Sequence, residues 1–144
     1  MNVSKDIFKD WMIVVVDDEP DAAAILKDVL EFYGATVQIA YHVHGALGLI
    51  QSCKPQFIIT DLMMPGFSGI DLLESLQAAE GELAQIPVVG MTAYLKPNDK
   101  KPFYQLGFRY FLTKPIKVTE VVGDLVSQLK DDLPGLRARL DPPE

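Results

Sequence analysis

Two short runs of this chain contain only apolar residues and lead directly toward carboxylates. The run from Trp11 to Val16 is followed by Asp17-Asp18-Glu19, and Phe57-Ile58-Ile59 leads through Thr60 into Asp61. A strand that is apolar on both faces is typical of a parallel sheet covered by helices on each side. These runs therefore predict buried parallel strands with acidic residues at their ends.

Helical patterns separate the predicted strands. Pro20 suits the first turn of a helix, Gly34 a helix end, and Ser68 with Asp71 a capping box. The predicted strands are 11–16, 36–39, 57–60, 88–91 and 109–112, and the clearest helical stripe runs from Val118 to Leu129. Strands that alternate in this way with about five helices predict an α/β domain with a parallel sheet.

Three segments fit this pattern less well. Residues 1–10 are mixed polar and predict a loose N-terminal arm, and the tail 131–144 predicts fraying chain, so the domain is expected over 11–130. Pro97 and Pro102 both resist a helix interior. Any helix between residues 96 and 106 is therefore expected to be short and to begin late.

Composition excludes several classes of function. The net charge of −7 and the acidic pI argue against a nucleic-acid-binding surface, which needs a basic patch. Cys53 is the only cysteine, which rules out an intramolecular disulfide and fits a reducing compartment. The chain has neither a signal-peptide pattern nor an apolar run of membrane-spanning length. We expect a cytoplasmic domain with no membrane or nucleic-acid partner.

Polar residues cluster at one predicted rim of the sheet, where ligands of parallel α/β proteins bind. The strand-end residues are Asp17, Asp18, Asp61, Thr92 and Lys114. Three carboxylates repel one another unless a cation joins them, and an oxygen-only ligand set favours Mg²⁺. An ammonium and a hydroxyl beside one carboxylate suit a phosphoryl group on that carboxylate.

Four motifs in this order resemble those of the receiver domains of two-component response regulators. They are Val14-Val15-Val16-Asp17-Asp18-Glu19, Thr60-Asp61-Leu62-Met63-Met64-Pro65 through Gly69, Met91-Thr92-Ala93 and Leu112-Thr113-Lys114-Pro115. The resemblance extends from about Trp11 to Leu129. It implies a flavodoxin-like three-layer α/β/α sandwich whose five parallel strands lie in the order 2-1-3-4-5.

The resemblance also implies a phosphotransfer site. Asp61 would be the phosphoacceptor, receiving a phosphoryl group from a histidine kinase or a histidine phosphotransfer protein. Asp18 and Asp61 would bind Mg²⁺ directly, with Asp17 beside them and the backbone carbonyl of Met63 as a further ligand. The chain would catalyse no reaction beyond its own phosphorylation and dephosphorylation.

Further residues match the family's switch. Thr92 would move its hydroxyl onto the phosphoryl oxygens, Lys114 would pair with them, and the Lys114-Pro115 peptide would be cis. Phe111 matches the aromatic switch residue, where many members have tyrosine, so the hydroxyl is missing here. Phe103, Tyr104 and Tyr110 form either an exposed aromatic docking patch or part of the core.

Two bulky residues suggest a slow loss of the phosphoryl group. Met63 and Tyr94 stand two positions after the phosphoacceptor and two after the threonine, where family members flank the route of the attacking water. We hypothesise that both side chains slow hydrolysis of the aspartyl phosphate.

The expected output is a protein–protein interaction. About fifteen residues follow the last predicted helix, so we expect either a stand-alone receiver or a segment of a longer regulator, without a DNA-binding output domain. By likeness to the family, a dimer would form through the fourth helix, the fifth strand and the fifth helix.

Two alternatives compete with the switch. An aspartyl-nucleophile phosphatase of the haloacid-dehalogenase type would need a second acid two residues after Asp61, where this chain has Met63. A receiver-like scaffold that has lost phosphorylation would have no need of the acidic residues, the threonine and the lysine.

Overall fold

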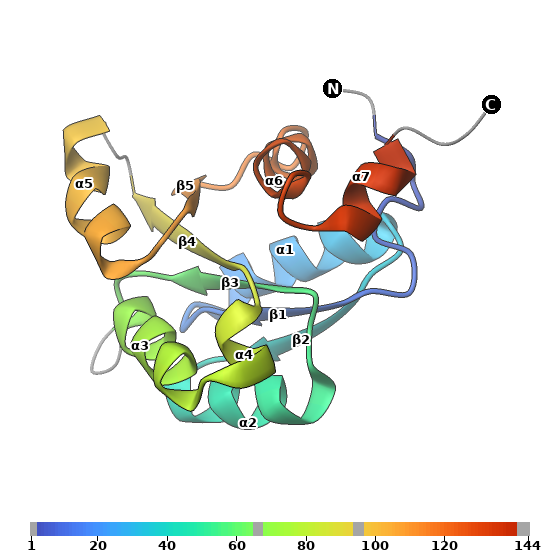
Figure 1. Ribbon diagram of the computed structural model, residues 1–144. Helices are drawn as coiled ribbons and strands as arrows, with labels where there is room; N and C mark the ends of the chain where they lie inside the picture. Colours follow the sequence, from blue (N-terminus) through green and yellow to red (C-terminus); the bar gives the residue numbers. More distant parts are fainter. Residues whose placement is uncertain (1–2, 65–67, 94–96, 141–144) are drawn as a thin grey trace.

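The computed structural model describes residues 3–64, 68–93 and 97–140, and its centre is a five-stranded parallel sheet (Figure 1). The strands lie in the order β2-β1-β3-β4-β5, as the resemblance implies. Their bounds are β1 (Met12–Val16), β2 (Thr36–Ala40), β3 (Phe57–Asp61), β4 (Val88–Ala93) and β5 (Tyr110–Lys114). The α/β prediction is confirmed.

Helices cover both faces of the sheet. Helices α1 (Pro20–Phe32) and α6 (Val121–Leu129) pack on one face, and α2 (Val43–Cys53) and α3 (Gly69–Ala79) pack on the other. Within β1, Ile13 and Val15 join the first core and Val14 and Val16 join the second. This alternation is why β1 must be apolar at every position.

Local chemistry sets the helix ends as predicted. Pro20 is the first residue of α1, and Gly34, with a φ of +101°, follows its end. Ser68 and Asp71 form the predicted capping box at the start of α3, with the Ser68 N–H donating to Asp71 Oδ2 at 2.7 Å. This cap fixes where α3 begins after the Asp61 loop.

Residues 3–10 and 131–140 pack against the domain, where the sequence predicts loose chain. Ile7 and Phe8 are buried, and the tail forms α7 (Pro134–Leu140), in which Leu136 is fully buried. The Arg139 guanidinium lies 5.0 Å from the Trp11 ring centroid and donates to the Ile7 carbonyl at 3.0 Å. The loose arm and the fraying tail are therefore wrong for residues 3–10 and 131–140, because the two segments cover each other's apolar side chains beside the core.

The segment with two prolines is also more helical than predicted. Helix α5 (Pro97–Leu106) begins at Pro97, where a missing N–H leaves no hydrogen bond unmade, and it contains Pro102. The expectation of a short, late helix is therefore wrong. A short helix, α4 (Gly81–Gln85), also precedes β4. None of the described helices has the length and apolar character needed to span a membrane.

Candidate functional site

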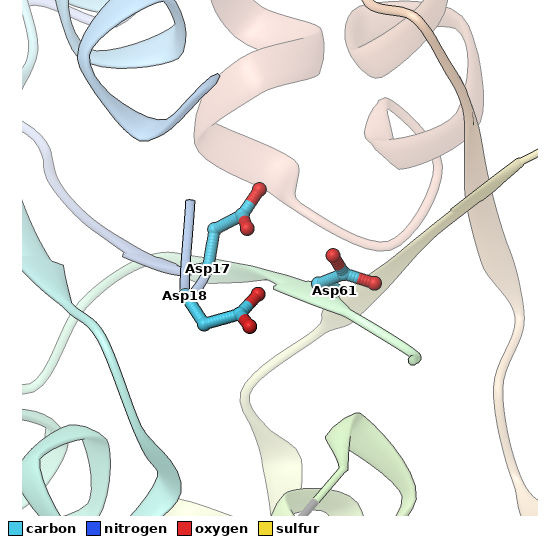
Figure 2. Close-up of side chains that lie close together, drawn as sticks. All are labelled: Asp17, Asp18 and Asp61. Carbon is cyan, nitrogen blue, oxygen red and sulfur yellow. The ribbon is translucent and has the colours of Figure 1, made fainter. Parts of the chain in front are cut away.

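Three carboxylates meet at the carboxyl end of the sheet. Asp17 and Asp18 directly follow β1 and Asp61 ends β3, and these strands are paired in register with Val16 opposite Thr60. Carboxylate oxygens of the three residues lie within 4.8 Å of one another (Figure 2). Asp17 and Asp61 are buried and Asp18 is exposed. The structure thus brings together the acidic residues that the sequence places on one rim.

Lys114 joins this cluster from the end of β5. Its Nζ lies 2.6 Å from Asp61 Oδ2 and 3.1 Å from Asp17 Oδ2, and its side chain is only 20% exposed. Burial lowers the pKa of the Lys114 ammonium, but hydrogen bonds and charge interactions with Asp61 and Asp17 outweigh burial and raise that pKa overall. The Lys114-Pro115 peptide is cis, as the resemblance implies.

Backbone groups orient the two buried carboxylates. The Met63 N–H donates to Asp61 Oδ1 at 2.9 Å, and the Glu19 N–H donates to Asp17 Oδ1 at 3.0 Å. Asp17 Oδ2 is buried and, apart from its ion pair with Lys114, receives no well-aligned hydrogen bond from the described residues. Burying such an oxygen is unfavourable unless a further positive group approaches it.

These residues fit a hard divalent cation. The donors are carboxylate oxygens, which Mg²⁺ prefers, and no histidine or cysteine is part of the described cluster. Three carboxylates and one ammonium leave two negative charges for a cation to neutralise. The incompletely paired Asp17 oxygen and the exposed Asp18 both supply coordination capacity.

Thr92 and Phe111 lie on the neighbouring strands. Thr92 is nearly buried, and its hydroxyl donates to the Ala93 carbonyl at 3.3 Å. The Phe111 ring is 9% exposed and packs edge-on against Tyr104, with a centroid separation of 5.2 Å. The residues of the predicted aromatic patch differ in exposure: Tyr104 is half exposed, whereas Tyr110 is buried in the core.

Met63, one of the two residues predicted to slow hydrolysis, lies exposed beside the carboxylate cluster. The Met63 side chain is 72% exposed beside Asp61, and its N–H already contacts that carboxylate. Tyr94 lies outside the described residues.

One contact beside the site could not be predicted from the sequence. The Gln128 side chain on α6 makes two hydrogen bonds to the backbone of Phe111, each of 2.8 Å. A glutamine between apolar positions of a helical stripe resembles any surface residue. Within α6 its Nε2 also donates to the Asp124 carbonyl, at 3.4 Å, but the two shorter hydrogen bonds arise because α6 packs against β5.

Comparisons with known proteins point to one family. The family model of the response regulator receiver domain matches residues 13–125. A 14.6 kDa protein encoded in the sodA1 3′ region of Leptolyngbya boryana is 33% identical over 76% of this chain and 83% of its own length. The sensor protein GacS of Pseudomonas syringae pv. syringae is 32% identical over 72% of this chain, which spans only 12% of GacS. The chain spans half of the DNA-binding response regulator MtrA of Mycolicibacterium smegmatis, at 31% identity over 82% of this chain.

Solved structures share the fold. The chemotaxis protein CheY4 of Vibrio cholerae superimposes with a TM-score of 0.76 at 22% identity, over 83% of this chain and 98% of that one. The signal receiver domain of a histidine kinase from Syntrophus aciditrophicus gives a TM-score of 0.70 at 30% identity, over 93% of this chain and 95% of that one.

Proposed function

This chain belongs to the family of response regulator receiver domains, and we propose that it is a phosphorylation-controlled switch whose phosphoacceptor is Asp61. The observation that carries the proposal is the 2.6 Å pair between Asp61 and Lys114 inside the three-carboxylate cluster. A carboxylate at a sheet rim, oriented by a backbone N–H and paired with an ammonium, is suited to hold a phosphoryl group.

In the proposed reaction, an Asp61 oxygen bonds to the phosphorus of a phosphohistidine while the phosphorus–nitrogen bond of the donor breaks. Lys114 stays beside Asp61 and neutralises charge on the phosphoryl oxygens. Asp17, Asp18 and Asp61 would hold Mg²⁺, which supplies further positive charge to those oxygens when bound. The backbone carbonyl of Met63 is the proposed additional ligand.

The proposed switch couples the phosphoryl group to the protein surface. Thr92 would exchange its hydrogen bond to the Ala93 carbonyl for one to a phosphoryl oxygen. Phe111, on the adjacent strand, would shift with it and favour a binding-competent surface by population shift. The donor would be a histidine kinase or a histidine phosphotransfer protein, and the output a protein contact rather than nucleic acid.

The lifetime of the switch would depend on Met63 and Tyr94. The exposed Met63 side chain beside Asp61 supports the idea that it obstructs attacking water. Replacing Met63 and Tyr94 together with small polar residues should speed decay of the aspartyl phosphate. An unchanged decay rate would contradict this role.

Intact-mass spectrometry tests the proposal directly. The protein is incubated with Mg²⁺ and acetyl phosphate as a small acyl-phosphate donor, beside Asp61→Asn and the matched surface variant Asp28→Asn. We expect a single phosphoryl adduct on the wild-type and Asp28→Asn proteins and none on Asp61→Asn. Multiple turnover on unrelated phosphoesters would favour a phosphatase, and the absence of an adduct with both acetyl phosphate and a phosphohistidine donor would favour a scaffold.

A further inference from the structure

We infer that Gln128 is a positioning residue, which fastens the outer edge of β5 and so holds Lys114 against Asp61. This inference rests on the proposed phosphoacceptor function for its effect on reaction rate. Its structural part, the restraint of β5, can be tested without phosphorylation.

Gln128 takes the place of a neighbouring strand. β5 is an edge strand, and in the described part of the chain β4 is its one strand partner. On the other side, Gln128 Oε1 accepts from the Phe111 N–H and Gln128 Nε2 donates to the Phe111 carbonyl, both at 2.8 Å. A side-chain amide that satisfies both backbone groups of one residue reproduces the pairing of a sheet.

The helix that carries Gln128 is firmly anchored. Val122, Leu125, Val126 and Leu129 are all buried in the core beneath α6. Asp132, four residues after Gln128, accepts a hydrogen bond from the Tyr110 hydroxyl. Two consecutive residues of β5 are therefore linked to α6 and to the turn that follows it.

Helix α5 contacts β5 in a different way. Phe103 and Tyr104 pack against the Phe111 ring, and the Lys100 ammonium lies 5.7 Å from its centroid. Within the described residues, these contacts involve the ring, whereas the hydrogen bonds to the Phe111 backbone on the outer edge of β5 come from α6.

Lys114 lies three residues beyond Phe111 at the end of the same strand. Successive residues of a strand present their N–H and C=O groups to opposite edges, so the Phe111 groups face Gln128 whereas the Lys114 amide faces β4. A restraint at Phe111 reaches Lys114 only through the strand itself. The 2.6 Å contact to Asp61 leaves little tolerance for movement of that strand end.

A simpler role would be that Gln128 only satisfies two edge groups that water would otherwise satisfy. The two roles differ at Lys114, which Gln128 does not contact. If Gln128 only satisfies these groups, replacing it speeds hydrogen exchange at the Phe111 amide alone. If Gln128 positions β5, replacing it also speeds exchange at the Lys114 amide and slows phosphorylation of Asp61.

The test compares Gln128→Met, which keeps the length of the side chain and removes both hydrogen bonds, with Gln128→Glu, which keeps only the acceptor. Gln105→Met, at an exposed position of α5, is the matched control. Amide hydrogen exchange is followed by NMR at Phe111 and Lys114, and phosphorylation by acetyl phosphate with Mg²⁺ is followed by intact mass.

In Gln128→Met we expect exchange at Phe111 to rise about tenfold. Exchange at Lys114 should rise severalfold, and phosphorylation should slow by about fivefold or more. Gln128→Glu should lie between Gln128→Met and the wild type, and Gln105→Met should match the wild type. Faster exchange at Phe111 alone, or an unchanged phosphorylation rate, would overturn the positioning role. If the wild-type protein took up no phosphoryl group, the proposed function would fail, while the Lys114 exchange would still decide whether Gln128 restrains β5.

Discussion

Asp18 offers a test of the cation site that does not depend on phosphorylation. Its carboxylate approaches those of Asp17 and Asp61 to within 4.8 Å, yet among the described residues it makes no hydrogen bond or ion pair of its own. Lys114 pairs with the other two carboxylates. In the absence of a metal ion, the charge on Asp18 therefore adds repulsion without compensation, and Asp18→Asn removes that charge with little change in shape.

The expected gain follows from the charges around Asp18. Asp17, Asp61 and Lys114 together carry one net negative charge. A unit charge 4.8 Å from another in water is repelled by about 1 kcal/mol, and water is the appropriate medium because Asp18 is exposed. Asp18→Asn should therefore stabilise the metal-free protein by about 1 kcal/mol. For a domain of this size that corresponds to a rise in Tm of about 2–4 °C.

Mg²⁺ should make the wild type more stable than Asp18→Asn and so reverse their order of stability. A ligand that binds only the folded state adds about 1.4 kcal/mol of stability at ten times its Kd. The wild type should gain this stability as Mg²⁺ is raised, whereas Asp18→Asn, with one carboxylate fewer, should gain much less.

Urea unfolding, followed by fluorescence of the buried Trp11, measures both effects in EDTA and across a Mg²⁺ series. Asp28→Asn, which removes an exposed charge on α1 away from the cluster, controls for net charge. The reasoning fails if Asp18→Asn is less stable than the wild type in EDTA, or if Mg²⁺ stabilises both proteins equally.

Three further predictions concern stability. Burial and the hydrogen bond to Asp132 raise the pKa of the Tyr110 hydroxyl to about 12, so stability from this group should persist below pH 10 and be lost as the pH rises from about 10 to 12. Tyr110→Phe should lower the free energy of unfolding by about 1 kcal/mol at neutral pH, and its stability should fall less steeply between about pH 10 and 12, as measured by urea titrations. An unchanged dependence of stability on pH in that range would contradict this prediction. Leu136→Ala should cost about 3 kcal/mol by the same assay, whereas a loose tail would give no change. Lys54 has a φ of +46° at the end of α2, so Lys54→Gly should raise the stability by about 1 kcal/mol, and a lower Tm would argue against backbone strain there.

The sheet and the acidic rim could be predicted because local patterns determine both. A strand such as β1, apolar at every position, fits only a sheet covered on two faces. Once the strands are parallel, their carboxyl ends share one edge, so Asp17, Asp18, Asp61 and Lys114 must approach one another. Their separation along the sequence is then irrelevant, and Lys114 reaches Asp61 across 53 positions.

The chain ends and the edge of β5 could not be predicted because their partners are distant and chemically ordinary. Arg139 donates to the Ile7 carbonyl 132 positions away, and neither segment shows an amphipathic pattern strong enough to predict burial. Pro97 and Pro102 weaken the helical signal of α5, although the first of them suits a helix start. Gln128 shows the same limit, because its role depends on which strand α6 packs beside.

The contacts around Asp61 also indicate that β5 and β4 have different roles in the proposed switch. In the proposed switch Lys114 would keep its position during phosphoryl transfer, because it pairs with the Asp61 carboxylate and would then pair with the phosphoryl group attached there. The Thr92 hydroxyl instead makes, among the described residues, one long hydrogen bond of 3.3 Å to the Ala93 carbonyl, which a phosphoryl oxygen would replace at little cost. A strand held on both edges, as β5 is by β4 and Gln128, suits the first role. β4 is also paired on both edges as far as Met91, but its last residues, Thr92 and Ala93, lie beyond the pairing with β3 and pair only with β5 among the described residues. This end of β4 is therefore the part that can respond.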